Sequence, residues 1–350
     1  MFFASDNWAG ADDRINRAIL SQSGFKSGYN AGEADEAVRR QLSELFETEV
    51  SVWFVATGTA ANSIALALAG KPGGVAFGHE EAHILVDECG GPEFFSGGRL
   101  CAVPGQNGKM DPQALVAAIA RYPAGFVHHG RPAAVSISQA TELGTFYRRD
   151  ELAAIVAIAR AEGLLVHMDG ARFANALVAS GMTPAEMTWK AGVDLLSFGG
   201  TKNGCWAAEA IVCFKPELSG ELAFHHKRAG QLFSKSRFIA AQFSAYLEDG
   251  HWLSLARHAN LMTEKLVEGL RRSGRARLFI EPQCNETFVV LNTATATALE
   301  AAGAKFFEWA LPASHAGALQ PGEKLYRLIT SFATTPEHVT GFLEALERAG

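Results

Sequence analysis

Several features that mark whole classes of protein are missing from this sequence. Its five cysteines are scattered and form no CxxC pair, so a reduced, cytoplasmic protein is the simplest interpretation. No run of about 18 uncharged apolar residues exists, which argues against a membrane span. The N-terminus soon meets Asp6 and has no basic segment, so it does not resemble a signal peptide.

An excess of positive charge is also absent. The formal net charge of -6 gives no basic surface for nucleic acid. No cluster with the spacing of metal ligands appears, so no metal is expected. With 48% hydrophobic and 19% charged residues, the chain has an ordinary globular composition, and its 350 residues suggest one large domain plus a smaller one.

Helix and strand patterns alternate over the first part of the chain. Helices are expected over 33–47 and 150–162, the second capped by Asp150 and ended by Gly163. Strands are expected at 52–55, 133–137, 164–169 and 193–198. This alternation indicates βαβ units and a mainly parallel sheet, and therefore an α/β fold.

The pattern changes after about residue 250. A long helix over 252–272 precedes three short strands and a final helix that starts at Pro336. The strands are expected at 288–291, 306–310 and 326–331. We therefore expect a large domain over residues 1–250 and a smaller C-terminal α+β domain over 251–350.

Three segments with reactive side chains, 57–62, 169–172 and 201–202, each follow an expected strand. Parallel sheets collect functional groups at the carboxyl ends of their strands. Gly58 and Thr59 would offer N–H groups to an anion at a helix N-terminus, although the same turn also suits a purely structural role.

Asp169 and Lys202 extend this pattern to a specific cofactor. A carboxylate at the mouth of a sheet needs a cationic partner, which is either Arg172 or a bound pyridinium nitrogen. A single lysine is by default a surface residue. However, the order of anion-binding turn, aspartate and lysine is the one that a pyridoxal 5'-phosphate (PLP) site requires. Two interpretations of His83 remain: a half-buried structural histidine, or a side chain that stacks on the cofactor ring.

Segments along nearly the whole chain resemble the low-specificity L-threonine aldolases in order and spacing. The segments HMDGARF (167–173) and FGGTKNG (198–204) are highly specific together. Residues 230–235 resemble the bacterial branch of that family. Further matching segments lie at 5–7, 58–62, 82–83 and 87–90.

The resemblance implies an aspartate-aminotransferase-like fold, PLP as cofactor, and a homodimer or homotetramer with shared active sites. It makes Lys202 the Schiff-base lysine and Asp169 the partner of the ring nitrogen, with His83 stacked on the ring. The other residues that it places at the cofactor are Gly58, Thr59, Gln139, Arg172 and Thr201. Those that it places at the substrate are Ser5, Arg172 and Arg327, with Tyr29 reaching in from the neighbouring subunit.

The chain departs from the family pattern at two places. Many members have Gly-Asp-Asp after the tyrosine, whereas this chain has Asn30-Ala31-Gly32. In one branch a second histidine follows the central strand and contacts the substrate hydroxyl. Here Thr141, in the segment 138–142, is expected to occupy that place.

The implied reaction is retro-aldol cleavage of L-threonine, L-allo-threonine and related β-hydroxy-α-amino acids to glycine and an aldehyde. Arg172 and Arg327 would clamp the substrate carboxylate, and His83 or a water that it holds would take the hydroxyl proton. A PLP-dependent β-elimination lyase or aminotransferase would share the lysine–aspartate pair. A non-catalytic α/β protein that binds an anion at Gly58-Thr59 is the alternative outside enzymes.

We predict that borohydride reduction of the yellow purified protein attaches the cofactor to Lys202. The reason is that this lysine alone follows an expected strand end among glycines that allow close approach. Peptide mapping by mass spectrometry measures the position, and Lys202→Ala should remain unlabelled. Labelling of a different lysine would show that the assignment is wrong.

Overall fold

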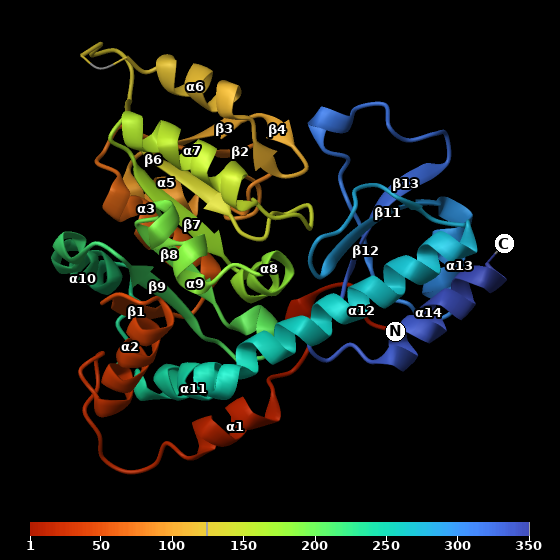
Figure 1. Cartoon of the computed structure of the whole chain (residues 1–350), viewed down its shortest axis with the longest axis horizontal. Coiled ribbons are helices and arrows are strands. Elements are labelled where there is room, and N and C mark those ends of the chain that lie inside the picture. Colours follow the sequence, from red (N-terminus) through yellow and green to blue (C-terminus); the bar gives the residue numbers. More distant parts are fainter. Residues whose placement is uncertain (124, 350) are drawn as a thin grey trace.

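The protein is described by a computed structural model that covers residues 1–123 and 125–349. Ala124 and Gly350, which fall in the predicted domains 1–250 and 251–350, lie outside the described residues. The larger part of the molecule is built on a seven-stranded sheet (Figure 1). In spatial order its strands are β1 (Ser51–Val55), β9 (Glu209–Cys213), β8 (Leu195–Gly199), β7 (Leu165–Gly170), β6 (Arg131–Ser138), β2 (Gly74–His79) and β3 (Arg99–Val103).

Only β9 runs antiparallel within this sheet; the other neighbouring strands are parallel. This confirms the predicted α/β architecture with a mainly parallel sheet. Alternate residues of a strand face opposite sides. In β1, Val52 and Phe54 join one apolar core, whereas Trp53 and Val55 join the core on the other face.

Helices cover both faces of the sheet. The first of these cores includes residues of α1 (Asp13–Leu20), α2 (Glu33–Leu45), α6 (Pro112–Ala120), α7 (Arg149–Ala161), α8 (Phe173–Ser180) and α11 (Arg237–Leu247). The other includes residues of α3 (Gly58–Ala69) and α10 (Ser219–Arg228). Short elements complete this part: α4 (His83–Val86), α5 (Gly91–Ser96), α9 (Pro184–Met187) and the hairpin of β4 (Gly105–Gln106) and β5 (Lys109–Met110).

The predicted boundaries of α7 need one correction. The helix begins at Arg149, and Arg148 is its capping residue in place of Asp150. The side chain of Glu151 accepts a hydrogen bond from the Arg148 N–H at 2.8 Å, which satisfies a donor that the helix leaves free. Gly163 follows the helix with a φ of +68°, as a residue at that position should.

A second, antiparallel sheet forms the C-terminal part. Its strands, in spatial order, are β10 (Arg277–Leu278), β11 (Glu286–Asn292), β13 (Glu323–Ile329) and β12 (Phe307–Glu308). It packs with α12 (His251–Ser273), α13 (Thr293–Ala301) and α14 (Pro336–Arg348). Figure 1 shows α12 running from the neighbourhood of α8 and α11 to α13 and α14, so it spans both parts.

The N-terminal residues belong to the second core rather than to the first. Phe3 is fully buried there, and its carbonyl accepts from the Ile329 N–H at 2.8 Å. The division of the chain into two domains between residues 250 and 251 stays a prediction. The first residues of the chain, however, pack in the core of the C-terminal part. Within the described residues, every helix is too short or too polar to cross a membrane.

Candidate active site

Two adjoining cavities lie at the carboxyl ends of β1, β7 and β8. The sheet cavity, of about 280 Å³, contains Gly58, Asp169 and Glu209 in its wall. The inter-sheet cavity, of about 370 Å³, is completed by β11, β12 and β13 of the second sheet. The residues that line both are Asn7, His83, Glu142, Arg172 and Lys202.

Nine of the eleven predicted site residues line one or both cavities. The structure places them there from segments far apart in the chain: Ser5, Gly58, Thr59, His83, Asp169, Arg172, Thr201, Lys202 and Arg327. Tyr29 is exposed on the loop before α2, outside both cavities. Gln139 is fully buried and, among the described residues, its amide donates to the Tyr147 carbonyl and accepts from the Tyr147 N–H; its contact with a cofactor stays a prediction.

Local structure explains how the anion-binding turn and the lysine are presented. Thr57 caps α3, since its Oγ1 accepts from the Ala60 N–H at 3.1 Å. The N–H groups at this helix start have no intrahelical acceptor and suit an anion. Lys202 sits in the turn Thr201–Asn203 directly after β8. The buried Asn203 anchors this turn through hydrogen bonds to the Tyr246 hydroxyl and the Trp252 carbonyl.

Asp169 is held by neutral donors. Its Oδ2 accepts from Asn62 Nδ2 at 2.8 Å and its Oδ1 from the Ala171 N–H at 3.0 Å. Within the described residues it forms no ion pair, so the alternative in which Arg172 is its partner is wrong. Asp169 therefore remains available to a cation brought by a ligand.

Asn62 links Asp169 to His83 through a second carboxylate. The same Asn62 amide nitrogen lies 2.8 Å from Glu88 Oε1, which lies 2.9 Å from His83 Nδ1. The hydrogen bond with Glu88 is the largest cause that raises the pKa of His83, and burial opposes it. Glu88 thereby orients the imidazole and favours a proton on Nδ1.

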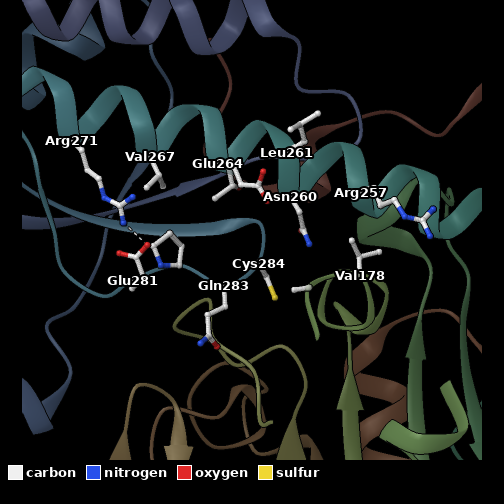
Figure 2. Close-up of a pocket in the computed structure, with 13 residues that line it drawn as sticks. Val178, Arg257, Asn260, Leu261, Glu264, Val267, Arg271, Glu281, Gln283 and Cys284 are labelled. Atoms are coloured by element: carbon white, nitrogen blue, oxygen red, sulfur yellow. Dashed lines mark hydrogen bonds and ion pairs between the residues drawn. The ribbon is translucent and has the colours of Figure 1, made fainter. Parts of the chain in front are cut away.

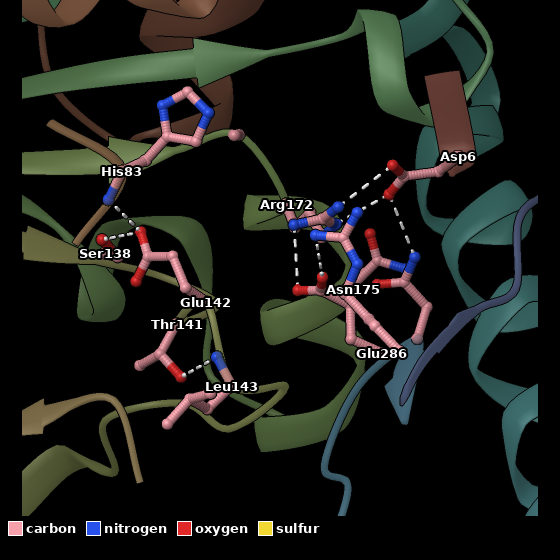
Figure 3. Close-up of polar contacts among 12 residues, drawn as sticks. Asp6, His83, Ser138, Thr141, Glu142, Leu143, Arg172, Asn175 and Glu286 are labelled. Atoms are coloured by element: carbon pink, nitrogen blue, oxygen red, sulfur yellow. Dashed lines mark hydrogen bonds and ion pairs between the residues drawn. The ribbon is translucent and has the colours of Figure 1, made fainter. Parts of the chain in front are cut away.

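Arg172 and Arg327 both lie beside the carboxylate of Glu286. Arg172 binds Asp6 through Nε at 2.7 Å and Nη2 at 3.0 Å, and its Nη1 lies 2.9 Å from Glu286 Oε2 (Figure 3). Arg327 Nη1 lies 3.8 Å from Glu286 Oε1, and its guanidinium lies 4.0 Å from the centre of the Trp309 ring. Burial lowers the pKa of Arg327. Two cations and two anions thus form one buried cluster.

The expected position of Thr141 is wrong. Its hydroxyl is fully buried and lies 2.9 Å from that of Thr145, away from both cavities. The next residue, Glu142, faces them instead, and its Oε1 accepts from Ser138 Oγ at 2.7 Å and from the His83 N–H at 2.9 Å (Figure 3). Burial, and then the charge of Asp169, raise the pKa of Glu142 to about 7.

A larger cavity, of about 580 Å³, lies elsewhere, between α12 and the segment 281–284 (Figure 2). It contains none of the predicted site residues. Arg271 on its wall is paired with Glu281, and burial raises the pKa of the Cys284 thiol, which keeps it protonated. In the described part of the chain no group of three His, Cys, Asp or Glu side chains could hold a metal ion.

Comparison with known proteins places this geometry in context. The family model of the beta-eliminating lyases matches residues 3–294. A low-specificity L-threonine aldolase of Pseudomonas aeruginosa is 40% identical over 308 residues, which cover 87% of this chain and 88% of that protein. A threonine aldolase structure from Leishmania major superposes with a TM-score of 0.92 at 27% identity, covering 99% and 98% of the chains.

A more distant structure shares the fold alone. Serine palmitoyltransferase of Sphingomonas wittichii superposes with a TM-score of 0.71 at 20% identity. The superposition covers 100% of this chain and 87% of the other. The aminotransferase-like architecture expected from the sequence is therefore confirmed.

We predict that Glu88→Gln lowers the pKa of His83, because a neutral amide stabilises the imidazolium less than a carboxylate does. NMR titration of the ring measures it, with the exposed Glu44→Gln as control. The folded-state pKa is raised, so the stabilisation by His83 is full below its ordinary value of 6.5 and is lost as the pH rises through the folded value. As the pH rises from 6.5 through the folded-state pKa of His83, the contribution of His83 to the free energy of unfolding should fall in the wild type. The difference in that contribution between wild type and Glu88→Gln should therefore become smaller. An unchanged His83 pKa would contradict the role given to Glu88.

Proposed function

Because this chain belongs to the low-specificity L-threonine aldolase family, we propose that it cleaves L-threonine, L-allo-threonine and related β-hydroxy-α-amino acids to glycine and an aldehyde. PLP is its cofactor. The observation that carries the proposal is the convergence of Lys202, an Asp169 free of ion pairs, and two arginines on two adjoining cavities.

The sheet cavity has the groups that PLP requires. The N–H groups of Gly58 and Thr59, with the Thr201 hydroxyl, suit its phosphate. Asp169 suits its ring nitrogen, and Lys202 can bind its aldehyde carbon covalently. When bound, PLP supplies an electron sink for the electron pair released at the substrate Cα.

Each residue around the ring then has a defined task. Asp169, kept in place by Asn62, would hold a proton on the ring nitrogen by charge. His83 would pack against the ring, and Glu88 sets the orientation of the imidazole. Burial raises the pKa of Glu209 to about 7, so this carboxyl beside Thr201 carries only part of a negative charge at neutral pH.

The substrate carboxylate binds at the arginine cluster. A guanidinium has five N–H donors; Arg172 donates two of them to Asp6, and its Nη1 forms an ion pair with Glu286. Arg172, Arg327 and Ser5 all line the inter-sheet cavity, where they could bind the carboxylate. Glu286 keeps the two like-charged arginines converged before the substrate arrives. Clamping the carboxylate would hold the substrate in the orientation in which its Cα–Cβ bond is the one that breaks.

We propose a homodimer or homotetramer with shared sites. Tyr29 is 59% exposed and has a φ of +59°, a conformation that a tyrosine adopts only when its surroundings impose it. Leu20 and Phe25, nearby in the sequence, are exposed too. A second copy that covers this segment would bury these apolar side chains and bring Tyr29 to the neighbouring site. All five cysteines are free thiols, which supports a place in the reducing cytoplasm.

We predict that the PLP-loaded enzyme releases equal amounts of glycine and acetaldehyde from L-threonine or L-allo-threonine. The two products follow from breaking the Cα–Cβ bond and protonating Cα. Amino-acid analysis and coupled reduction of the aldehyde measure both. Ammonia with an oxo acid would indicate the β-elimination alternative, and transfer of the amino group to an added oxo acid would indicate an aminotransferase.

We also predict that Arg327→Ala raises KM and lowers kcat/KM by about 10- to 100-fold, because a charge-assisted contact to a carboxylate contributes about 1.5–3 kcal/mol. The cofactor absorbance should persist, since Arg327 lies on the inter-sheet cavity alone. Arg277→Ala, on β10 of the same sheet and half-exposed, is the matched control. Normal KM in Arg327→Ala would mean that the clamp is assigned to the wrong residue.

A further inference from the structure

The reaction needs a group that takes the proton of the β-hydroxyl, and the structure offers a carboxyl for it. We propose that Glu142 is this catalytic base. The inference rests on the proposed function, because it concerns the β-oxygen of that substrate. Among the described residues Glu142 is the sole carboxylate that lines both cavities. A substrate whose Cα lies near Lys202 and whose carboxylate lies at Arg327 must cross the boundary where Glu142 stands.

The two carboxyl oxygens of Glu142 differ in their hydrogen bonding. Oε1 accepts from the Ser138 hydroxyl and from the His83 N–H, and these two donors fix the carboxyl in place (Figure 3). Oε2 is shielded from solvent and, among the described residues, has no hydrogen-bond donor. A buried acceptor without a donor is unfavourable by roughly 1–3 kcal/mol. Once the carboxyl turns toward the cavity, a hydroxyl carried in by the substrate would supply the missing donor.

The groups around Glu142 bring its pKa close to neutral pH. The ionisable groups that face it are Asp169 on β7, Arg172, His83 on α4 and Tyr147. Burial and the negative charge of Asp169 raise its pKa to about 7. A base with a pKa close to the working pH is both available and strong enough to accept a proton.

His83, the base expected from the family resemblance, is less suited. Its Nδ1 is committed to Glu88, and that hydrogen bond raises the pKa of the imidazole. Its proposed position against the cofactor ring also gives His83 a different task from binding the β-hydroxyl. Every other carboxylate that lines these cavities borders only one of them: Asp169, Glu88 and Glu209 line the sheet cavity, and Glu81, Asp87 and Glu286 line the inter-sheet cavity.

The step balances without a further reactant. Glu142 takes the hydroxyl proton, and the O–H electron pair becomes the second bond of the aldehyde C=O. The electron pair of the broken Cα–Cβ bond goes to Cα, which takes a proton from water to give glycine. After the aldehyde leaves, Glu142 returns its proton to water, so the protons balance. No net oxidation or reduction occurs on the protein.

The test compares two reactions of the loaded enzyme in Glu142→Gln. Glutamine keeps an oxygen for Ser138 and the His83 N–H but cannot accept a proton. Cleavage of L-allo-threonine should fall by about 100-fold or more. Exchange of the glycine α-hydrogen with D2O, followed by NMR, needs no β-oxygen and should stay within about threefold. The dissociation constant for L-2-aminobutyrate, which lacks the hydroxyl, should also stay within about threefold.

The pH profile and a second variant complete the test. The wild-type kcat should rise with pH through about 7, because the base must be deprotonated, and the variant should lose that rise. Glu44→Gln changes an exposed carboxyl on α2 and leaves Glu142 and its two donors in place, so it should retain the cleavage and the rise with pH. Equal losses of cleavage and glycine exchange in Glu142→Gln, or losses in Glu44→Gln as large as in Glu142→Gln, would overturn the inference. If the wild type releases no aldehyde, the proposed function fails instead.

Discussion

The buried ion cluster of Asp6, Arg172, Glu286 and Arg327 joins three parts of the chain that are far apart in sequence. Asp6 comes from the N-terminal segment, Arg172 from the end of β7, and the other two from β11 and β13 of the second sheet. Because charges this deep require partners, each member fixes the position of the next. The relative placement of the two sheets and the shape of the inter-sheet cavity both depend on this cluster.

The cluster also prepares the molecule for its proposed substrate. Its four charges sum to zero, and Asp6 and Glu286 offset the repulsion between the two arginines. A substrate carboxylate adds a negative charge to a neutral group, and the donors that Arg172 and Arg327 still have free must stabilise it. The two arginines are therefore already in position before the substrate binds. Because the cluster has no net charge, it attracts an anion less strongly than two unpaired arginines would.

The carboxyl groups around the sheet cavity are divided by their surroundings. Asp169 and Glu88 both accept a hydrogen bond from the amide nitrogen of Asn62. Glu142 and Glu209 are buried near the negative charge of Asp169, and their pKa values rise to about 7. Carboxyl groups around one cavity therefore have different electrostatic surroundings.

The sequence by itself determined the alternation that produces the parallel sheet, and the strand ends at which Gly58, Asp169 and Lys202 lie. These features are local, since strand period, caps and glycines act within a few residues. Only the tertiary structure decided that Glu142 rather than Thr141 faces the cavities, that Gln139 is buried, and that Asp6 and Glu286 take the charge of Arg172. Those outcomes depend on which side chain a loop turns inward, and contacts between residues hundreds of positions apart determine that choice.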